Sequence, residues 1–229
     1  MTTIHVSQKK GAKLNTGSKR YPLTTIPAAI KQAVPGDTVE IGEGRYPSFT
    51  IRSLHGRRGQ EITIQGEPGA AQPVIDAHQP GGKPGYVVHF LNDGSYINLR
   101  HLTITTSDPR LAESRAMDIT TPDGLREWLK IAGEVTMRWG DGIRFNRSGK
   151  GPTFNRILVE NCHVHDLPSC ALSGQLHNSR IQHCQFEHCG YPGSGYGIYA
   201  EQSNGLSIVD NTIHDCTGWG VTVAGMHRC

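Results

Sequence analysis

Three polar residues in the second half of the chain have the types that proton transfer on a sugar acid requires. Arg144, Tyr199 and Glu201 each stand at an outward position of a short alternating run that follows a Gly-rich turn. If these runs are neighbouring parallel strands, matching side chains lie roughly 5 to 7 Å apart. A guanidinium can neutralise a carboxylate, and a Tyr, His or Arg beside it can move the proton. We expect these three residues and His177 to be catalytic; the alternative is a solvated sheet face with no chemistry.

Further polar residues flank this face and are expected to bind the substrate, namely His89, Asp141 and Asn146. Alignment of the runs predicts two outward columns of side chains. One column holds His89, Arg144, Leu172, Tyr199 and Thr222, and the other holds Leu91, Asn146, Gly174, Glu201 and Ala224.

A second polar constellation follows another set of runs. His165, Glu187 and His214 share an outward position, and the next position holds Asp166, His188 and Asp215. A stack of His, Glu and His could hold a divalent metal if the side chains converge. His-Asp pairs at these places also serve as turn residues, so both interpretations stay open.

The runs that carry these residues belong to a repeated pattern. The segments at 159–167, 181–189 and 208–216 align without a gap, at steps of 22 and 27 residues. A step of this size is typical of a solenoid. Each unit contains runs of three to five alternating residues separated by Gly, Asn, Asp and Ser, which indicates short strands and turns. No unit has room for an amphipathic helix, so helical repeats are excluded.

Strands and turns stacked in parallel make a parallel β-helix. Stacking would place Val159, Ile181 and Ile208 over one another inside the coil. It would also align two further columns: Leu102, Cys162, Cys184 and Asn211 at a tight turn, and Ile104, Val164, Phe186 and Ile213 pointing inward. We expect Asn211 to adopt a left-handed conformation there and to hydrogen-bond along the stack.

Residues 4–46 carry a more specific pattern. It consists of His5-Val-Ser, Gly11, Asn15-Thr-Gly17, Tyr21-Pro-Leu-Thr-Thr-Ile26, Ala29-Ile30, Ala33, Pro35-Gly-Asp-Thr-Val39 and Gly44-Arg-Tyr46. This pattern resembles the opening block of secreted right-handed parallel β-helix proteins of the pectin and pectate lyase-like superfamily. The resemblance implies an all-β, single-stranded right-handed parallel β-helix that cleaves uronate chains by β-elimination. In many relatives this uses a Lys or Arg base and calcium held by carboxylates.

The chain departs from that pattern on the expected sheet face. No lysine and no cluster of three or four acidic residues falls there, and the paired-Asp pattern of polygalacturonase-type hydrolases is absent. The base and the calcium ligands therefore have no assigned residues, and Ca²⁺ remains only an implied cofactor.

Two segments interrupt the strands of this single predicted domain, 1–229. Within residues 1–46, a helix beginning near Pro27, capped by Thr24 or Thr25, presents Ile26, Ala29, Ile30 and Ala33 and should cover the open end of the coil. Residues 107–141 form an insertion with a helix-start signature at Thr121. It is either a lid over a groove or a decoration on the side.

Composition limits the partners. A net charge of +3 does not favour binding to nucleic acid. The sequence contains no stretch of 18 apolar residues, so no membrane-spanning helix is predicted. The start of the chain lacks a signal-peptide pattern, so either the protein is cytoplasmic or a signal has been removed; the resemblance implies a secreted or cell-surface protein. The run at 220–224 has no repeat after it, so we expect a truncated chain, a domain of a longer protein, or a further domain or subunit that covers that coil.

Two hypotheses for function follow. The first is a polysaccharide lyase-like protein that acts on an acidic, uronate-containing polysaccharide. The second is a non-catalytic module, either polysaccharide-binding or a structural surface or tail-fibre component. Cys189 and Cys216 fall at equivalent places on adjacent coils, where either a disulfide or two thiols would fit.

Overall fold

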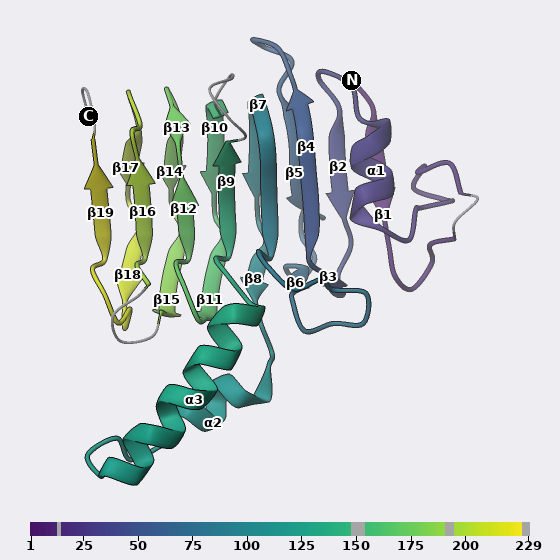
Figure 1. Cartoon of the computed structure of the whole chain (residues 1–229). Helices are drawn as coiled ribbons and strands as arrows, with labels where there is room; N and C mark the ends of the chain where they lie inside the picture. Colours follow the sequence, from purple (N-terminus) through teal and green to yellow (C-terminus); the bar gives the residue numbers. More distant parts are fainter. Residues whose placement is uncertain (13–14, 148–153, 191–194, 226–229) are drawn as a thin grey trace.

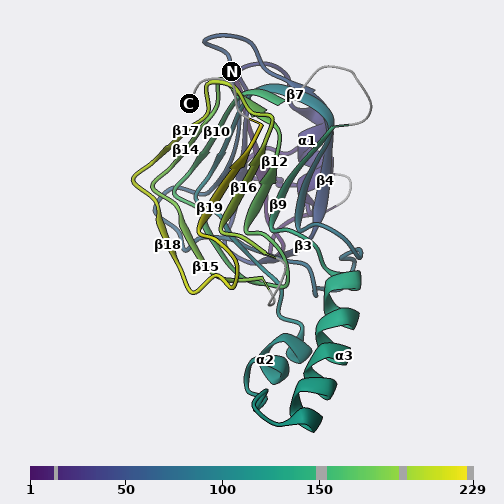
Figure 2. The same cartoon turned by 60° about the vertical axis from the view of Figure 1, so that its left-hand side comes forward.

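The computed structural model describes residues 1–12, 15–147, 154–190 and 195–225, which form a coil of parallel strands (Figure 1). Every strand pair in the ladders is parallel, and successive coils stack along one axis. The predicted parallel β-helix is therefore confirmed. Figure 2 looks obliquely along the stack and shows three strand-bearing faces.

The first face carries the candidate site. It consists of β4 (Phe49–His55), the first part of β7 (Val88–Arg100), β9 (Ile143–Arg147), β12 (Leu172–Gly174), β16 (Ile198–Glu201) and β19 (Val221–Ala224). Because β7 bends, its second part continues into the second face.

The second face begins at the N-terminus. It consists of β1 (Thr3–Val6), β2 (Thr38–Ile41), β5 (Ile62–Gly66), the rest of β7, β10 (Phe154–Glu160), β13 (Leu176–His177), β14 (Arg180–Gln182) and β17 (Ser207–Val209). The third face consists of β3 (Arg45–Pro47), β6 (Val74–Asp76), β8 (Thr103–Thr105), β11 (His163–Leu167), β15 (Gln185–Cys189) and β18 (Thr212–His214).

The core is built from inward columns that run from coil to coil. Val159 pairs with Ile181, and Ile181 with Ile208, as the sequence pattern predicts. Phe90 and Phe145 stack with their ring centroids 4.6 Å apart, and both are buried. Each such apolar side chain contributes roughly 1.5 to 3 kcal/mol on burial, so the columns stabilise the coil along its length.

The predicted hydrogen bonds along the tight-turn column are confirmed, but the predicted backbone conformation of Asn211 is not. The Asn211 side chain donates to the Ile181 carbonyl and accepts from the Cys184 N–H, both at 2.9 Å. The left-handed residue, however, is the one before each column position, namely His101, Asn161, His183 and Asp210. The prediction that Asn211 itself is left-handed is therefore wrong: its side chain bridges the coils, and the preceding residue makes the turn.

The predicted N-terminal cap is helix α1 (Ile26–Gln32). The Thr25 hydroxyl accepts from the Ala28 N–H, and Pro27 stands in the first turn. Ile26, Ala29 and Ile30 are buried, and the helix lies against the first coils (Figure 1). The helix therefore covers strand edges that would otherwise be open, and it presents its polar face to solvent.

The insertion forms a helical hairpin of α2 (Pro109–Arg115) and α3 (Pro122–Arg138), so α3 extends beyond the helical segment foreseen at Thr121. The Trp139 indole N–H donates to Asp108 Oδ2 at 2.7 Å and closes the base of the hairpin. Figure 1 shows the hairpin pointing away from the coil, so it decorates the side; only the last turn of α3, through Thr136, borders a pocket of the first face.

Among the described helices, none has the length and apolarity needed to cross a bilayer. The described cysteines, which exclude Cys229, are free thiols, so Cys189 and Cys216 form no disulfide here. Val221 and Val223 on β19 are exposed. A further domain or subunit over this strand stays a prediction.

Candidate functional site

One outward column crosses the first face from coil to coil. His89 pairs with Arg144, Arg144 with Ser173, Ser173 with Tyr199, and Tyr199 with Thr222. The predicted column is therefore correct except at Leu172, which points inward between Ile143 and Ile198. The error is a slip of one residue, and such a slip exchanges the two sides of a strand.

The same slip affects the neighbouring column. Leu91 pairs with Asn146, and Glu201 pairs with Ala224, as predicted. Gly174 instead pairs with Phe145 and Ala200 on the inward side. A side chain at Gly174 would meet the Phe145 carbonyl oxygen at 2.2 Å, so this position requires glycine for a close approach of two coils.

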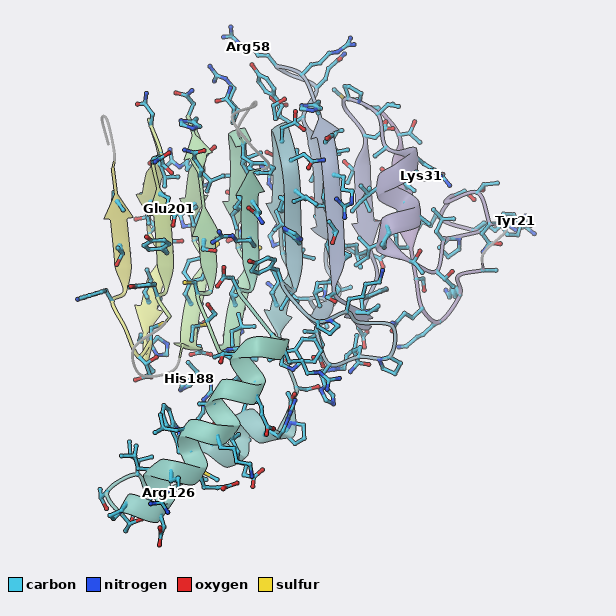
Figure 3. The ribbon with its side chains drawn as sticks, in the orientation of Figure 1. Tyr21, Lys31, Arg58, Arg126, His188 and Glu201 are labelled. Atoms are coloured by element: carbon cyan, nitrogen blue, oxygen red, sulfur yellow. The ribbon has the colours of Figure 1, made fainter. Side chains whose placement is uncertain are left out.

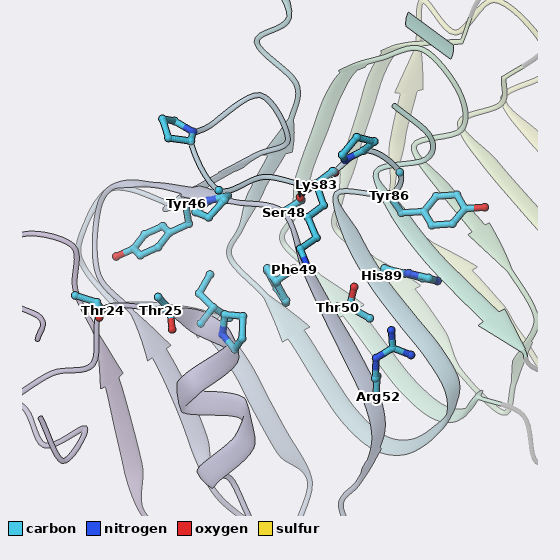
Figure 4. Close-up of a pocket in the computed structure, with 17 residues that line it drawn as sticks. Thr24, Thr25, Tyr46, Ser48, Phe49, Thr50, Arg52, Lys83, Tyr86 and His89 are labelled. Atoms are coloured by element: carbon cyan, nitrogen blue, oxygen red, sulfur yellow. Dashed lines mark hydrogen bonds between the residues drawn. The ribbon is translucent and has the colours of Figure 1, made fainter. Parts of the chain in front are cut away.

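A pocket of about 740 Å³ lies where α1, β4 and the 80–86 segment meet (Figure 4). Arg52, Lys83 and His89 line it, together with Tyr86 at one margin. Figure 4 shows Lys83 reaching across Phe49 toward Thr50. The Ser48 hydroxyl accepts from the Lys83 N–H at 3.0 Å, which fixes the segment that carries this lysine.

A second pocket of about 410 Å³ lies on the other side of Tyr86. Tyr86 stands at one end, Tyr196 and Tyr199 at the other, and Arg144 and Asp141 lie between. We call these two pockets, which share Tyr86, the groove. It runs along the coil axis, across the strands of the first face.

His89 stands in the middle of the groove, with its ring centroid 4.8 Å from that of Tyr86. Burial, and then the positive charges of Arg52 and Arg144, lower the pKa of His89 below 6.5. Its Nε2 has no hydrogen-bond partner among the described residues. The lowered pKa favours the neutral imidazole at neutral pH, in which one ring nitrogen can accept a proton; the unpartnered Nε2 is buried.

The Arg144 side chain is held in place by Ser173, Asp141 and Tyr86. Its Nη1 donates to Ser173 Oγ at 2.9 Å and lies 3.5 Å from Asp141 Oδ2, and its guanidinium lies over the Tyr86 ring at 5.6 Å. Asp141 is buried and also accepts from Ser169 Oγ, the Cys170 N–H and Ser173 Oγ. Although Asp141 was expected to bind substrate, its carboxylate oxygens are occupied, and it positions Arg144.

Tyr199 and Glu201 lie together on β16, two coils from Arg144. The negative charge of Glu201, followed by partial burial and a hydrogen bond to Glu201, raises the pKa of Tyr199. Tyr199 therefore stays a protonated phenol across the physiological range. Asn146 lies on β9 beside Leu91, one coil before the coil of Ser173.

His177 does not join this group. It pairs with Asn155 on β10 and lines a different pocket with His55, Asp93 and Ser95. Its strand, β13, belongs to the second face, so the expectation that His177 borders Arg144 and Tyr199 is wrong. The chain turns a corner between Gly174 and Leu176, and the sequence pattern contained no signal for it.

Sequence reasoning also missed Arg52, Lys83 and Tyr86 as members of the groove. Arg52 lies on β4, before the regular repeats begin, so no alignment column contained it. Lys83 and Tyr86 lie in the irregular segment before β7. The only signal for Tyr86 was its place at the start of the alternating run that continues into β7.

The second constellation lies on the third face, away from the groove. His165 pairs with Glu187, and Glu187 with His214, as predicted. The Glu187 carboxylate lies 2.7 Å from His163 Nε2 and 2.9 Å from His214 Nε2. Burial would raise the pKa of Glu187, but hydrogen bonds from His163 and Gln185 outweigh it and lower that pKa. The cluster is a network of hydrogen-bonded His, Glu and Gln side chains.

The described ranges contain no group of three or more His, Cys, Asp or Glu side chains arranged to hold a metal. In the groove, the Asp141 oxygens are occupied and Glu201 pairs with Tyr199. Calcium takes six to eight oxygen ligands, several of them carboxylate. The described groove residues do not supply that set, so they do not fit the calcium site that the resemblance implied.

A family model described as "Right handed beta helix region" matches residues 130–228. The chain has a right-handed parallel β-helix fold. No curated protein sequence matches this β-helix.

Three solved structures share the fold at low identity. A GH136 lacto-N-biosidase from Eubacterium ramulus is 15% identical with a TM-score of 0.65, covering 92% of this chain and 41% of that one. The pectate lyase Pel9A is 14% identical with a TM-score of 0.64, covering 92% and 47%. An alginate lyase from Paenibacillus sp. str. FPU-7 is 17% identical with a TM-score of 0.58, covering 98% and 65%. This β-helix spans less than half the length of the first two.

Proposed function

We propose that this β-helix cleaves an acidic, uronate-containing polysaccharide by β-elimination in the groove. One observation carries the proposal: the His89 imidazole shares the groove with two guanidinium groups, Arg52 and Arg144, whose charges both act on it. The fold alone does not choose a function. The cations are what favour an acidic glycan over a neutral one.

The reaction makes three demands that the groove residues can meet. A uronate carboxylate needs a positive charge beside it, which acidifies the hydrogen on the adjacent carbon, and Arg144 and Arg52 supply that charge. A base must take this hydrogen as a proton, and His89 is the candidate: its Nε2 is buried without a hydrogen-bond partner and accepts the proton in the Nδ1–H tautomer once the substrate displaces the side chains that cover it. The C–H electron pair then forms the C=C bond as the C–O bond to the leaving sugar breaks.

The leaving oxygen needs a proton, and the Tyr86 hydroxyl is the nearest candidate donor. The Tyr86 ring contacts His89 and lies beneath Arg144. Tyr199 is too far to serve the same bond, because it stands two coils from Arg144, roughly 10 Å away. Tyr199, Glu201 and Asn146 instead bind neighbouring sugar units in this account, and Lys83 adds charge at the opposite end.

The pectate lyase and the alginate lyase with this fold carry names of enzymes that act on uronate polymers, which is consistent with the proposal. Such polymers lie outside the cell. We therefore also propose that the protein works in an extracellular setting.

The test is incubation of the full chain with pectate, alginate and a neutral glucan, with and without added calcium. Ultraviolet absorbance reports the unsaturated ends that only elimination creates. We expect product from at least one uronate polymer and none from the glucan. Absence of product from every uronate polymer would refute the lyase.

A second candidate is a non-catalytic polysaccharide-binding module. The stacked side chains of Tyr199 and Tyr196 at the edge of the groove favour sugar binding even without chemistry. Retarded migration in gels that contain a uronate polymer, with no unsaturated product, would assign the protein to this class.

A further inference from the structure

Three aromatic rings stand in a stack where the groove reaches the last described coils. Tyr196 lies between Tyr199 and Trp219. Its ring centroid is 5.1 Å from that of Tyr199 at an interplanar angle of 21°, and 5.6 Å from that of Trp219 at 11°. Nearly parallel rings at these distances stack face over face, so Tyr199 and Trp219 cover the two faces of Tyr196 and the outer face of Trp219 stays open.

The backbone aligns these rings. The Ala171 N–H donates to the Tyr196 carbonyl, and the Gly197 N–H donates to the Trp219 carbonyl, so Tyr196 and Trp219 hold equivalent positions on successive coils. Side chains at Gly197 or Gly218 would meet backbone oxygens of the adjacent coil at 2.5 and 2.1 Å. Glycines beside the aromatic residues thus allow the two coils to approach closely.

The exposure of Trp219 is unusual for this chain. Trp219 is 67% exposed, whereas Trp128 and Trp139 are 7% and 2% exposed and pack inside the helical insertion or at its base. A large aromatic side chain gains most from burial, so a tryptophan left in water at a binding groove offers its ring to a ligand. The face of a pyranose ring that carries C–H groups is flat and apolar, and it matches such a surface.

The stack continues the groove already described. Tyr196 and Tyr199 form the wall of the pocket that holds Arg144, so a polysaccharide that leaves Arg144 along the coil axis meets Tyr199, then Tyr196, then Trp219. We propose that the outer face of Trp219, supported from behind by Tyr196, is a sugar-stacking subsite for a pyranose unit of the same polysaccharide. This inference deepens the proposed function and rests on the same groove.

The subsite has a defined place in the substrate. Trp219 lies three coils from Arg144, roughly 14 Å along the axis, and an extended pyranose chain advances about one unit for each coil spacing. The stacked unit is therefore two to three units from the uronate at Arg144. Because rings and not cations form the surface, the unit is recognised by its C–H face whether or not it carries a carboxylate.

Tryptophan fluorescence offers a test independent of catalysis, because Trp219 is the exposed member of the three tryptophans. In the full chain, we expect acrylamide to quench the emission of this residue. Uronate oligosaccharides of four or more units should shift the emission saturably and protect it from the quencher. In Trp219→Phe the emission should not respond to the oligosaccharide.

Titration calorimetry measures how much the Trp219 ring contributes to the affinity for oligosaccharides. Trp219→Ala should weaken binding of the long oligosaccharides roughly three- to tenfold, as expected for loss of an aromatic contact. Trp219→Phe should retain most of the affinity, and disaccharides should bind all variants equally. Tyr21→Ala removes an exposed aromatic ring at the opposite end of the coil (Figure 3) and should change nothing.

The outcomes separate the two proposals. Failure of acrylamide to quench would mean that another polypeptide covers Trp219, and equal affinity of wild type and Trp219→Ala would mean that no sugar stacks there; either result overturns the subsite. Weakened binding by Trp219→Ala in a protein that releases no unsaturated product would keep the subsite and refute the lyase.

Discussion

His89 and Arg144 are register partners on β7 and β9, one coil apart on the same side of the sheet. A cation at that spacing disfavours a second positive charge, so Arg144 helps to keep His89 neutral. The same guanidinium would hold the carboxylate of the substrate. One register pair thus links the protonation state of the proposed base to the binding of its substrate.

Replacement of Arg144 therefore has two predicted effects. Arg144→Ala should lower kcat/KM on the uronate polymer about a hundred- to a thousandfold, because charge stabilisation in the transition state is lost. It should also raise the pKa of His89 toward 6.5, since one repelling charge is gone while burial remains. An NMR titration of the imidazole in the two proteins measures this shift.

Arg126→Ala is the matched control for Arg144→Ala. Arg126 lies on the helical hairpin, away from the coil (Figure 3), and its side chain is 80% exposed. We expect unchanged activity and an unchanged His89 titration. A His89 pKa that stays the same in Arg144→Ala would contradict the proposed coupling.

Asp76 should make the fold sensitive to acid. Its buried carboxylate accepts from the Ser107 N–H and hydroxyl, the His78 N–H, Gln79 and Arg45. Burial opposes ionisation, but these donors outweigh it and lower the pKa of Asp76 from 3.8 to about 2. The stabilisation is complete above pH 3.8 and is lost as the pH falls through the folded value.

Urea unfolding at a series of pH values measures this effect. Between about pH 4 and pH 2 the carboxylate of Asp76 should account for a loss of about 2 kcal/mol in the free energy of unfolding. Asp76→Asn should be less stable at neutral pH and should lose less stability over that interval. Parallel pH curves for the two proteins would show that Asp76 does not control the acid response.

Cys216 should be the most reactive of the described thiols. A hydrogen bond from the Cys189 thiol lowers the pKa of Cys216 to about 7, whereas burial raises the pKa of Cys189 and of Cys170. Since the thiolate is the nucleophile, a maleimide should label Cys216 first and faster as the pH rises through 7. Mass spectrometry of peptides identifies the labelled residue.

The background for that experiment is Cys229→Ser, because Cys229 lies outside the described residues. Cys189→Ala removes the hydrogen bond to Cys216 and should slow the labelling of Cys216 near neutral pH. First labelling of the buried Cys162 or Cys170 would be the opposite result and would argue against this arrangement of thiols.

The fold could be predicted from the sequence because each coil repeats the same pattern of buried and exposed positions. The inward positions of Val159, Ile181 and Ile208 recur at a nearly constant step, and alternation assigns each strand a buried side. The cap was accessible for a similar local reason, since Thr25 and Pro27 mark a helix start wherever they stand together.

The candidate site was harder to predict from the sequence, because it depends on strand register and on irregular segments. The position of Ser173 is fixed by backbone hydrogen bonds such as that from the Leu172 N–H to the Gly197 carbonyl, and counting along the sequence missed it by one residue. Lys83 and Tyr86 reach the groove from a segment with no repeat. Their partners, β4 and α1, are distant in sequence, so no spacing predicted the contact.

The most direct measurement is the initial rate of unsaturated product formation from the preferred uronate polymer by wild type and by His89→Ala at neutral pH. We predict a steady rate for the wild type and a loss of at least about a hundredfold in His89→Ala, with unchanged thermal stability and polymer binding. Equal rates for the two folded proteins would contradict the assignment of His89 as the base, and with it the proposed mechanism of the groove.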